Sequence, residues 1–179
     1  MTILGKTKKY VLTGRPYSGK STVLDLIQKK GYPVVPETAR MVIEEEQAKG
    51  SAILPWKDFS LFQDKVVLKQ TQLESEIAGP NVFLDRGILD SYAYSKLGKV
   101  DAPLYAYQDA HLRYTQVFIL ELLPGYTPDE VRKETAEYRI SIHQALFEVY
   151  EQFGYTPIEV PVLSPPERTE FILRHIESR

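Results

Sequence analysis

The sequence contains no cysteine. This absence excludes disulfide bonds, thiolate metal sites and cysteine nucleophiles, and it is compatible with a reducing compartment. No stretch approaches the roughly 18 apolar residues that a membrane-spanning helix needs. The N-terminal segment, MTILGKTKKY, also lacks the apolar run of a signal peptide. We therefore expect a soluble, cytoplasmic protein.

Charge of one sign is not in excess either. The 22 basic and 24 acidic residues leave a net charge of −2, so no global field draws the chain to nucleic acid, and transfer to a nucleic-acid end is disfavoured. The 3 histidines have no ligand-like spacing with acidic residues, so no metal beyond a nucleotide-bound Mg²⁺ is indicated. No repeat or low-complexity tract divides the sequence, and we expect a single domain over residues 1–179.

Short β-like apolar runs alternate with longer helical patterns along the chain. This alternation predicts an α/β fold with a parallel sheet and helices around it. Pro33 and Pro36 fall in the second predicted strand and donate no ladder hydrogen bond, so this strand should lie at the edge. Strands are predicted at residues 9–13, 32–36, 82–85, 116–122 and 156–160, helices at 20–30, 57–77 and 134–153, and capped helix starts at 127–130 and 164–167.

The loop after the first predicted strand carries the most specific motif. Residues 14–21, GRPYSGKS, match G-x-x-x-x-G-K-[ST] in full. Backbone N–H groups and the following helix dipole can converge on a phosphate, while Lys20 reaches the outer phosphates and the Ser21 hydroxyl binds Mg²⁺. The motif predicts ATP and Mg²⁺ as cofactors without distinguishing transfer from hydrolysis. The predicted cofactor-binding residues are Gly14, Arg15, Pro16, Tyr17, Ser18, Gly19, Lys20, Ser21 and Thr22.

Charged residues directly follow the second and third predicted strands. In an open parallel sheet, ligands bind outside the carboxyl ends of the strands, which is where these residues should lie. Asp85 ends the apolar run Val-Phe-Leu and can hold Mg²⁺ or accept a proton from a substrate hydroxyl. Arg86 suits a phosphate or a substrate oxygen. Glu37, in the stretch PETAR with Arg40, is a second candidate base. The alternatives are a turn-capping aspartate beside a surface arginine, and a first-turn glutamate that stabilises the next helix.

Two further arginines could form a lid over the site. Arg132 and Arg139 are seven residues apart and project from nearly the same helix face. Such a face can close over the transferred phosphate and neutralise its charge. An equally weighted alternative is a solvated helix in which Glu134 and Glu137 pair with these arginines.

The start of the third predicted helix is rich in aromatic residues. At helical spacing, Phe59 and either Phe62 or Gln63 could line a pocket for a flat ring, and Gln63 could read the edge of that ring. Core packing is the favoured alternative for the two phenylalanines.

Several motifs taken together resemble a known family. The order VLTGRPYSGKST, VVPETAR, VFLDRGILDSYAY, VRKETAEYR and GYTPIEVP is similar to that of the NadR/Ttd-type AAA domain family of P-loop ATPases and kinases, over nearly the whole chain. The resemblance implies a five-stranded parallel sheet in the order 2-3-1-4-5, a helical lid over about residues 123–139, and an adenine site near residues 160–164. It also implies nucleoside-kinase roles for Glu37, for Asp85 with Arg86, and for Gln63 as a nucleobase contact.

Two functions fit these residues. The first is a Mg²⁺-dependent kinase that transfers the γ-phosphate of ATP to a hydroxyl of a small, nucleoside-like acceptor. The second is a nucleotide-dependent switch or binding module that hydrolyses ATP or GTP, although no Asn-Lys-x-Asp guanine motif supports GTP. The kinase predicts an acceptor pocket lined by Glu37, Arg40, Gln63 and Arg86, and the switch predicts an exposed apolar patch instead. The candidate catalytic residues are Lys20, Glu37, Asp85, Arg86, Arg132 and Arg139.

Overall fold

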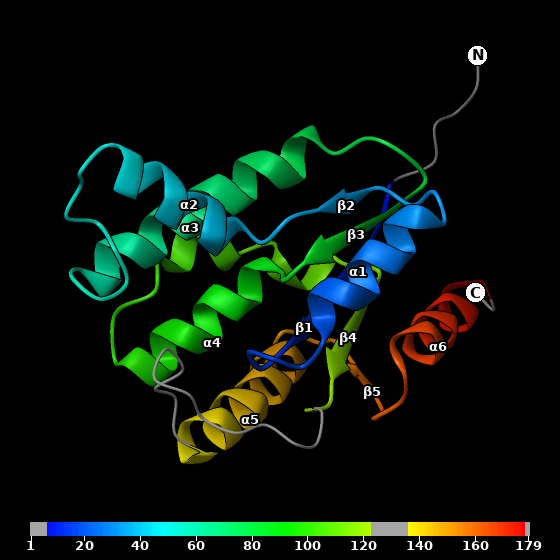
Figure 1. The fold of residues 1–179 in the computed structure, drawn as a ribbon. Coiled ribbons are helices and arrows are strands. Elements are labelled where there is room, and N and C mark those ends of the chain that lie inside the picture. Colours follow the sequence, from blue (N-terminus) through cyan, green and yellow to red (C-terminus); the bar gives the residue numbers. More distant parts are fainter. Residues whose placement is uncertain (1–6, 123–135, 178–179) are drawn as a thin grey trace.

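A parallel sheet of five strands forms the centre of the computed structural model, which describes residues 7–122 and 136–177. The strand order β2-β3-β1-β4-β5 confirms the predicted fold and places the proline-bearing strand at an edge. Helices α1 and α6 cover one face of the sheet, and α4 and α5 cover the other (Figure 1). The elements are β1 (Lys8–Gly14), α1 (Lys20–Lys29), β2 (Val34–Val35), α2 (Thr38–Ala48), α3 (Phe59–Glu76), β3 (Asn81–Asp85), α4 (Ile88–Gly98), the 3-10 turns Leu104–Tyr107 and Ala110–Leu112, β4 (Gln116–Leu120), α5 (Ala136–Gln152), β5 (Ile158–Val160) and α6 (Pro165–Glu177).

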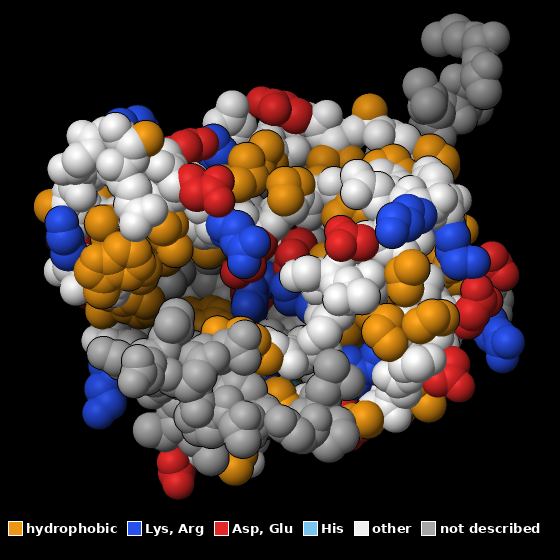
Figure 2. Space-filling model, in the orientation of Figure 1, with side chains coloured by type: hydrophobic (Ala, Val, Ile, Leu, Met, Phe, Trp, Pro, Cys, Tyr) orange, Lys and Arg blue, Asp and Glu red, His pale blue; other side chains and the backbone are white. Residues whose placement is uncertain are grey.

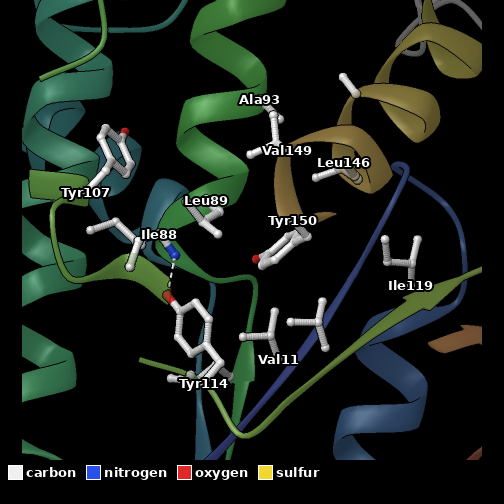
Figure 3. Close-up of a cluster of buried hydrophobic side chains, with 14 of the residues drawn as sticks. Val11, Ile88, Leu89, Ala93, Tyr107, Tyr114, Ile119, Leu146, Val149 and Tyr150 are labelled. Carbon is white, nitrogen blue, oxygen red and sulfur yellow. Dashed lines mark hydrogen bonds between the residues drawn. The ribbon is translucent and has the colours of Figure 1, made fainter. Parts of the chain in front are cut away.

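Successive residues of the central strand β1 point into two separate cores. Val11 packs with α4 and α5, whereas Tyr10 and Leu12 pack with α1 and α6. All are buried, as expected for a parallel strand that is covered on both faces. Figure 3 shows the first core, where Val11, Leu89 of α4 and Tyr150 of α5 converge.

The edge strand β2 is shorter than the predicted 32–36. It pairs with β3 only at Val34 and Val35. Pro33 still contributes its carbonyl oxygen, which accepts a hydrogen bond from the N–H of Phe83 at 2.9 Å. Because Pro36 has no N–H to donate, the ladder stops before it. The chain then turns away from the sheet into α2, which brings Glu37 to the carboxyl end of the strands.

Capping side chains set the starts of two helices. The backbone N–H of Ser164 donates to the Glu167 carboxylate at 3.0 Å, and the backbone N–H of Glu167 donates to the Ser164 hydroxyl at 3.5 Å, which confirms the capping box predicted for α6. Asp58 accepts from the N–H of Leu61 at 3.0 Å, so α3 begins at Phe59 and not at residue 57. The capping box predicted at 127–130 lies outside the described residues. Among those described, no helix has the length and apolar character to cross a membrane.

An ion pair joins Glu46 of α2 to Lys65 of α3, and Lys49 at the end of α2 forms a second pair with the same carboxylate. The Glu46 side chain is 3% exposed and lies 2.7 Å from Lys65 and 3.3 Å from Lys49. The hydrogen bond from Lys65 lowers the pKa of Glu46 from 4.5 to about 2. Since this folded-state pKa is depressed, Glu46 contributes stability that is complete above pH 4.5 and is lost as the pH falls toward about 2. We expect Glu46→Gln to flatten the dependence of the unfolding free energy on pH in this window, as measured by urea unfolding.

The control for this prediction is Glu44→Gln. Glu44 is an exposed residue of the same helix, with no ion pair among the described residues. Its replacement should leave the pH dependence as in the wild type. A Glu46→Gln protein with an unaltered slope would contradict the role assigned to these ion pairs.

Candidate functional site

The phosphate loop connects β1 to α1 at the carboxyl end of the central strand. Gly14 has a φ of 151°, and a Cβ at this position would lie 2.9 Å from the carbonyl oxygen of Leu120. Glycine is therefore required for this close approach to β4. Gly19, with a φ of 80°, immediately precedes the first turn of α1. The loop thus ends at a helix N-terminus, where unpaired N–H groups and the helix dipole favour a bound phosphate.

A buried arginine of α6 stabilises the phosphate loop by hydrogen bonds to backbone carbonyl groups. Arg168 of α6 is 1% exposed. Its guanidinium donates to the carbonyl oxygens of Ser18 at 2.5 Å, Glu121 at 2.9 Å and Pro161 at 2.9 Å. These carbonyls belong to the phosphate loop, the end of β4 and the turn after β5. One side chain therefore fixes the loop relative to the region where the adenine site is predicted.

Lys20 and Asp85 form an ion pair beneath the loop. Their side chains are 8% and 11% exposed. Burial raises the pKa of Asp85, and although Lys20 opposes this effect, the pKa stays above its ordinary value. The Asp85 carboxylate and the exposed Ser21 hydroxyl are hard oxygen donors of the kind that Mg²⁺ prefers, with phosphate oxygens and waters as its further ligands. Within the described part of the chain, no group of three His, Cys, Asp or Glu residues could hold a metal by itself.

Arg86 lies between two carboxylates. Its Nε donates to Glu37 at 2.9 Å, and its Nη1 lies 3.4 Å from Asp90 and 3.3 Å from the hydroxyl of Tyr94. The backbone at Arg86 has a φ of 75°, a left-handed conformation that costs about 1 kcal/mol or more for a residue with a side chain. Its N–H nevertheless donates to the carbonyl oxygen of Leu12 at 3.0 Å. The surrounding contacts therefore hold the guanidinium in a single position despite local strain.

The Glu37–Arg86 pair is charged at neutral pH. Burial would raise the pKa of Glu37, but Arg86 and then Lys20 outweigh it and hold that pKa below its ordinary value. Burial likewise opposes the charge on Arg86, yet Tyr94, Glu37 and Asp90 raise its pKa well above the usual range. Glu37 is therefore available as a carboxylate, which is the form that can accept a proton.

Two cavities adjoin at this pair. One cavity, of about 770 Å³, is bounded by the loop and α2, and we name it the phosphate cavity after its predicted ligand. The other, of about 350 Å³, is bounded by α2, α3 and α4, and we name it the acceptor cavity because the kinase interpretation predicts an acceptor there. Glu37 and Arg86 line both of them. Figure 2 shows this face hollowed near its centre, with basic and acidic side chains gathered in the hollow.

The structure brings most of the predicted site residues to these cavities. Gln63 lines the acceptor cavity with Glu37 and Arg86, whereas Arg40 lines only the phosphate cavity. The loop residues from Arg15 to Ser21 line the phosphate cavity, and Gly14 and Thr22 flank them. Arg132 lies outside the described residues, and Arg139 is in the first turn of α5 with a side chain that is not described.

Aromatic residues form the apolar wall of the acceptor cavity. Phe62 is buried against α2, and Phe59 packs on the same cluster, so the core-packing alternative is correct for both. Both also line the cavity, so the two interpretations describe the same side chains. Gln63 is 5% exposed and makes no hydrogen bond within the described residues. Its amide is therefore available to a ligand.

Two buried residues behind the site had no signal in the sequence. Gln70 of α3 accepts a hydrogen bond from Thr38, and its amide donates to Glu74 at 2.9 Å and toward the Arg86 carbonyl at 3.5 Å. It thus ties the first residue of α2 to the end of β3. Asp90 contacts Arg86 from the opposite side. The residues next to Gln70 and Asp90 in the sequence do not reveal these roles, because the hydrogen-bond partners are distant in sequence.

Comparisons with known proteins agree with this fold. A sequence model of an AAA domain family matches residues 9–168, whereas a sequence search of curated proteins finds no match. Among solved structures, a deoxyadenosine kinase from M. mycoides has a TM-score of 0.64 at 21% identity and covers 96% of this chain and 100% of its own. NadR has a TM-score of 0.66 at 17% identity and covers 96% of this chain, which spans only 50% of NadR. Shikimate kinase from Aquifex aeolicus has a TM-score of 0.60 at 18% identity, with 94% and 96% covered.

Proposed function

Since this chain belongs to the AAA domain family, we propose that it is a kinase that transfers the γ-phosphate of ATP, with Mg²⁺, to a hydroxyl of a small, nucleoside-like molecule. The observation that carries the proposal is the pair of adjoining cavities with Glu37 and Arg86 at their boundary. A triphosphate on the loop and a hydroxyl in the acceptor cavity would meet there. Bringing the two reactants together supplies much of the catalysis of phosphoryl transfer.

The phosphate loop would bind the phosphate donor, ATP. We assign the β- and γ-phosphates to Lys20 and the loop amides, and the metal to Ser21 and Asp85. When bound, Mg²⁺ would neutralise charge on the phosphate oxygens. The turn after β5 is the proposed adenine site, and Arg40, Arg132 and Arg139 are proposed to stabilise the developing charge.

The Glu37–Arg86 pair would act on the acceptor hydroxyl and on the phosphoryl group that it receives. Only Oε1 of Glu37 is bonded to Arg86, so Oε2 can accept the proton of the acceptor hydroxyl. The hydroxyl oxygen bonds to the γ-phosphorus while the bond from this phosphorus to the β,γ-bridging oxygen breaks, and ADP leaves. Nη2 of Arg86 makes no hydrogen bond within the described residues and can bind an oxygen of the transferred phosphoryl group.

The acceptor cavity favours an uncharged acceptor. Its charged groups among the described residues are the carboxylates of Glu37 and Asp90 and the guanidinium of Arg86, a net charge of −1. A phosphate monoester in this space would meet more negative than positive charge. The aromatic wall and the Gln63 amide suit a flat ring with hydrogen-bonding edges. A nucleoside therefore fits this chemistry better than a nucleotide.

Two of the similar structures support this assignment. The M. mycoides deoxyadenosine kinase contains the products dCMP and a flexible dCDP, and the NadR structure contains NR. The switch alternative predicts no acceptor pocket, so the cavity beside the loop favours the kinase.

ADP release with an acceptor panel tests the proposal. ATP and Mg²⁺ would be combined with nucleosides, their 5′-monophosphates, shikimate and small alcohols, with Lys20→Met as the blank. We expect nucleosides to raise turnover above the rate with water, and the corresponding monophosphates to raise it less. If ATP binds but no acceptor raises turnover, the kinase assignment is wrong and the nucleotide-dependent switch takes its place.

Substitution of Gly98 should narrow the acceptor cavity. Gly98 ends α4 against the Phe59 ring, and a Cβ there would lie 2.9 Å from Cδ1 of Phe59 and closer still to Cε1. Gly98→Ala therefore has to displace the ring, which lines the cavity. Overpacking of this kind typically costs about 1–3 kcal/mol of unfolding free energy. Because the displaced ring is part of the wall of the acceptor cavity, we also expect nucleoside affinity to fall about 10-fold, equivalent to roughly 1.4 kcal/mol, while the Kd for ATP stays unchanged. Calorimetric titration of each ligand measures both effects.

The double variant Gly98→Ala/Phe59→Leu is the matched control. Leucine is smaller than phenylalanine and leaves room for the new Cβ, so nucleoside affinity should recover. If Gly98→Ala weakens ATP and nucleoside equally, the substitution disturbs the whole domain and Phe59 does not form the wall of the acceptor site.

A further inference from the structure

Asp90 places one buried carboxylate where several segments of the site meet. It is the third residue of α4 and is 2% exposed. Its Oδ2 accepts from the N–H of Gly87 at 3.1 Å and from the hydroxyl of Tyr150 at 2.6 Å. Its Oδ1 accepts from the hydroxyl of Thr13 and from Nη1 of Arg86, the latter at 3.4 Å. The donors come from β1, β3, α4 and α5 or the turns beside them.

The two oxygens of Asp90 face different surroundings. Oδ2 accepts hydrogen bonds from the backbone N–H that precedes α4 and from the hydroxyl of Tyr150 in the core. Figure 3 shows the Tyr150 side chain pointing toward the N-terminus of α4. This half of the carboxylate accounts for an ordinary structural role. Oδ1 instead contacts Thr13, the residue before the phosphate loop, and Arg86, the residue between the two cavities. A capping role alone does not require these contacts.

Geometry limits what else could hold the Arg86 guanidinium. Glu37 binds Nε, and Nη1 has the carbonyl oxygen of Gly14 at 3.4 Å and the Tyr94 hydroxyl at 3.3 Å besides Asp90. Asp90 is the only carboxylate that the described residues place on Nη1. Two carboxylates on different nitrogens fix both the position and the rotation of the planar group. Without Asp90, Nη1 would lose its carboxylate partner, and the guanidinium could move on its side-chain torsions. This movement would turn Nη2 away from the reacting phosphate and weaken the hydrogen bond from Nε to Glu37.

We propose that Asp90 is a positioning residue, which orients Nη2 of Arg86 toward the transferred phosphoryl group and ties Arg86 to the start of the phosphate loop through Thr13. Glu37 would contact the acceptor hydroxyl, whereas Asp90 adds its charge to the wall of the acceptor cavity and affects the transfer step through Arg86. Loss of its charge should therefore lower kcat more than it raises either KM. The kinetic part of this inference rests on the kinase proposed above, whereas the orientation of Arg86 can be measured without any activity.

The first test observes the Arg86 side chain directly by NMR. The Nε–Hε signal of Arg86, identified by its absence in Arg86→Lys, should be resolved and protected from solvent exchange in the wild type. Tyr150→Phe removes a hydrogen bond to the same carboxylate from the core side, so it should lower the melting temperature and keep the signal. Asp90→Asn should lose or shift the signal. A signal unchanged in folded Asp90→Asn overturns the inference.

The second test is a double-mutant cycle on turnover, with Asp90→Asn and Arg86→Lys. We expect Asp90→Asn to lower kcat about 10- to 100-fold in the wild type and to have little further effect in Arg86→Lys, because both act through one group. Additive losses, or an equal loss of kcat in Tyr150→Phe, contradict a positioning role. If Asp90→Asn does not fold, Asp90→Glu keeps the charge but moves it, and the same loss of the NMR signal is expected. Absence of acceptor-stimulated turnover in the wild type would contradict the kinase alone, since the NMR test stands apart from it.

Discussion

Lys20→Met is expected to lower phosphoryl transfer by about 10³-fold, the usual scale for loss of a main electrostatic contact to transition-state charge. Methionine keeps most of the buried stem and removes only the ammonium. The Kd for ATP should rise as well, because the same group holds the outer phosphates. Initial rates of ADP formation and calorimetric titration of ATP measure the two effects. A variant with more than about a tenth of wild-type turnover would contradict the role given to Lys20.

This substitution should also destabilise the protein, because Asp85 loses its cation. Lys20 and Asp85 are nearly buried and pair with each other. Removal of one partner of such a pair typically costs about 3 kcal/mol of unfolding free energy. The double variant Lys20→Met/Asp85→Asn removes the uncompensated charge and should recover stability without recovering turnover. The two readouts thereby separate the catalytic effect from the structural one.

Glu37→Gln is expected to lower kcat by about 10²-fold, the lower range for loss of a general base. Glutamine keeps the size of the side chain and still accepts from Arg86, but it cannot accept a proton. The binding of ATP should be nearly unchanged, since Glu37 carries no phosphate contact in this assignment. Steady-state kinetics with a saturating acceptor measure the loss.

The pH profile provides the control for Glu37. Burial opposes ionisation of Glu37, but Arg86 holds its pKa below the ordinary value for a glutamate. A group of this kind takes up a proton only at acidic pH, so Glu37 should not limit turnover between about pH 5 and pH 8. A fall in activity with a midpoint near neutrality that disappears in Glu37→Gln would contradict this assignment. Asp85→Asn is the comparison variant, and it should instead raise the Mg²⁺ concentration needed for turnover.

The phosphate loop and the strand order could be predicted because their signals are local. A complete motif between a strand and a helix indicates the loop, and two prolines around Val34–Val35 indicate an edge strand. The position of Glu37, Asp85 and Arg86 at the carboxyl ends of the strands could be predicted because they directly follow apolar runs. Each of these inferences needs only a few neighbouring residues.

The supporting residues could not be predicted, because their function depends on contacts across the fold. Asp90 meets Tyr150 over a separation of 60 residues, and Arg168 meets Ser18 over 150. Helix α4 lacks a clear apolar stripe because α3 and α5 pack against different sides of it. A helix that is buried on several sides shows no amphipathic period in its sequence, so α4 could not be predicted from its pattern of apolar residues. Arg40 lines the phosphate cavity and not the acceptor cavity. This placement depends on the rotation of α2 about its axis, which the neighbouring residues in the sequence do not reveal.

The three carbonyl contacts of Arg168 have a consequence for how the protein is made. Arg168 follows Ser18 of the phosphate loop by 150 residues in the sequence. During synthesis, which proceeds from the N-terminus, the nascent chain therefore exposes a complete nucleotide-binding motif long before that motif has its support. We therefore expect a chain that stops before α6 to bind nucleotide more weakly than one that includes this helix.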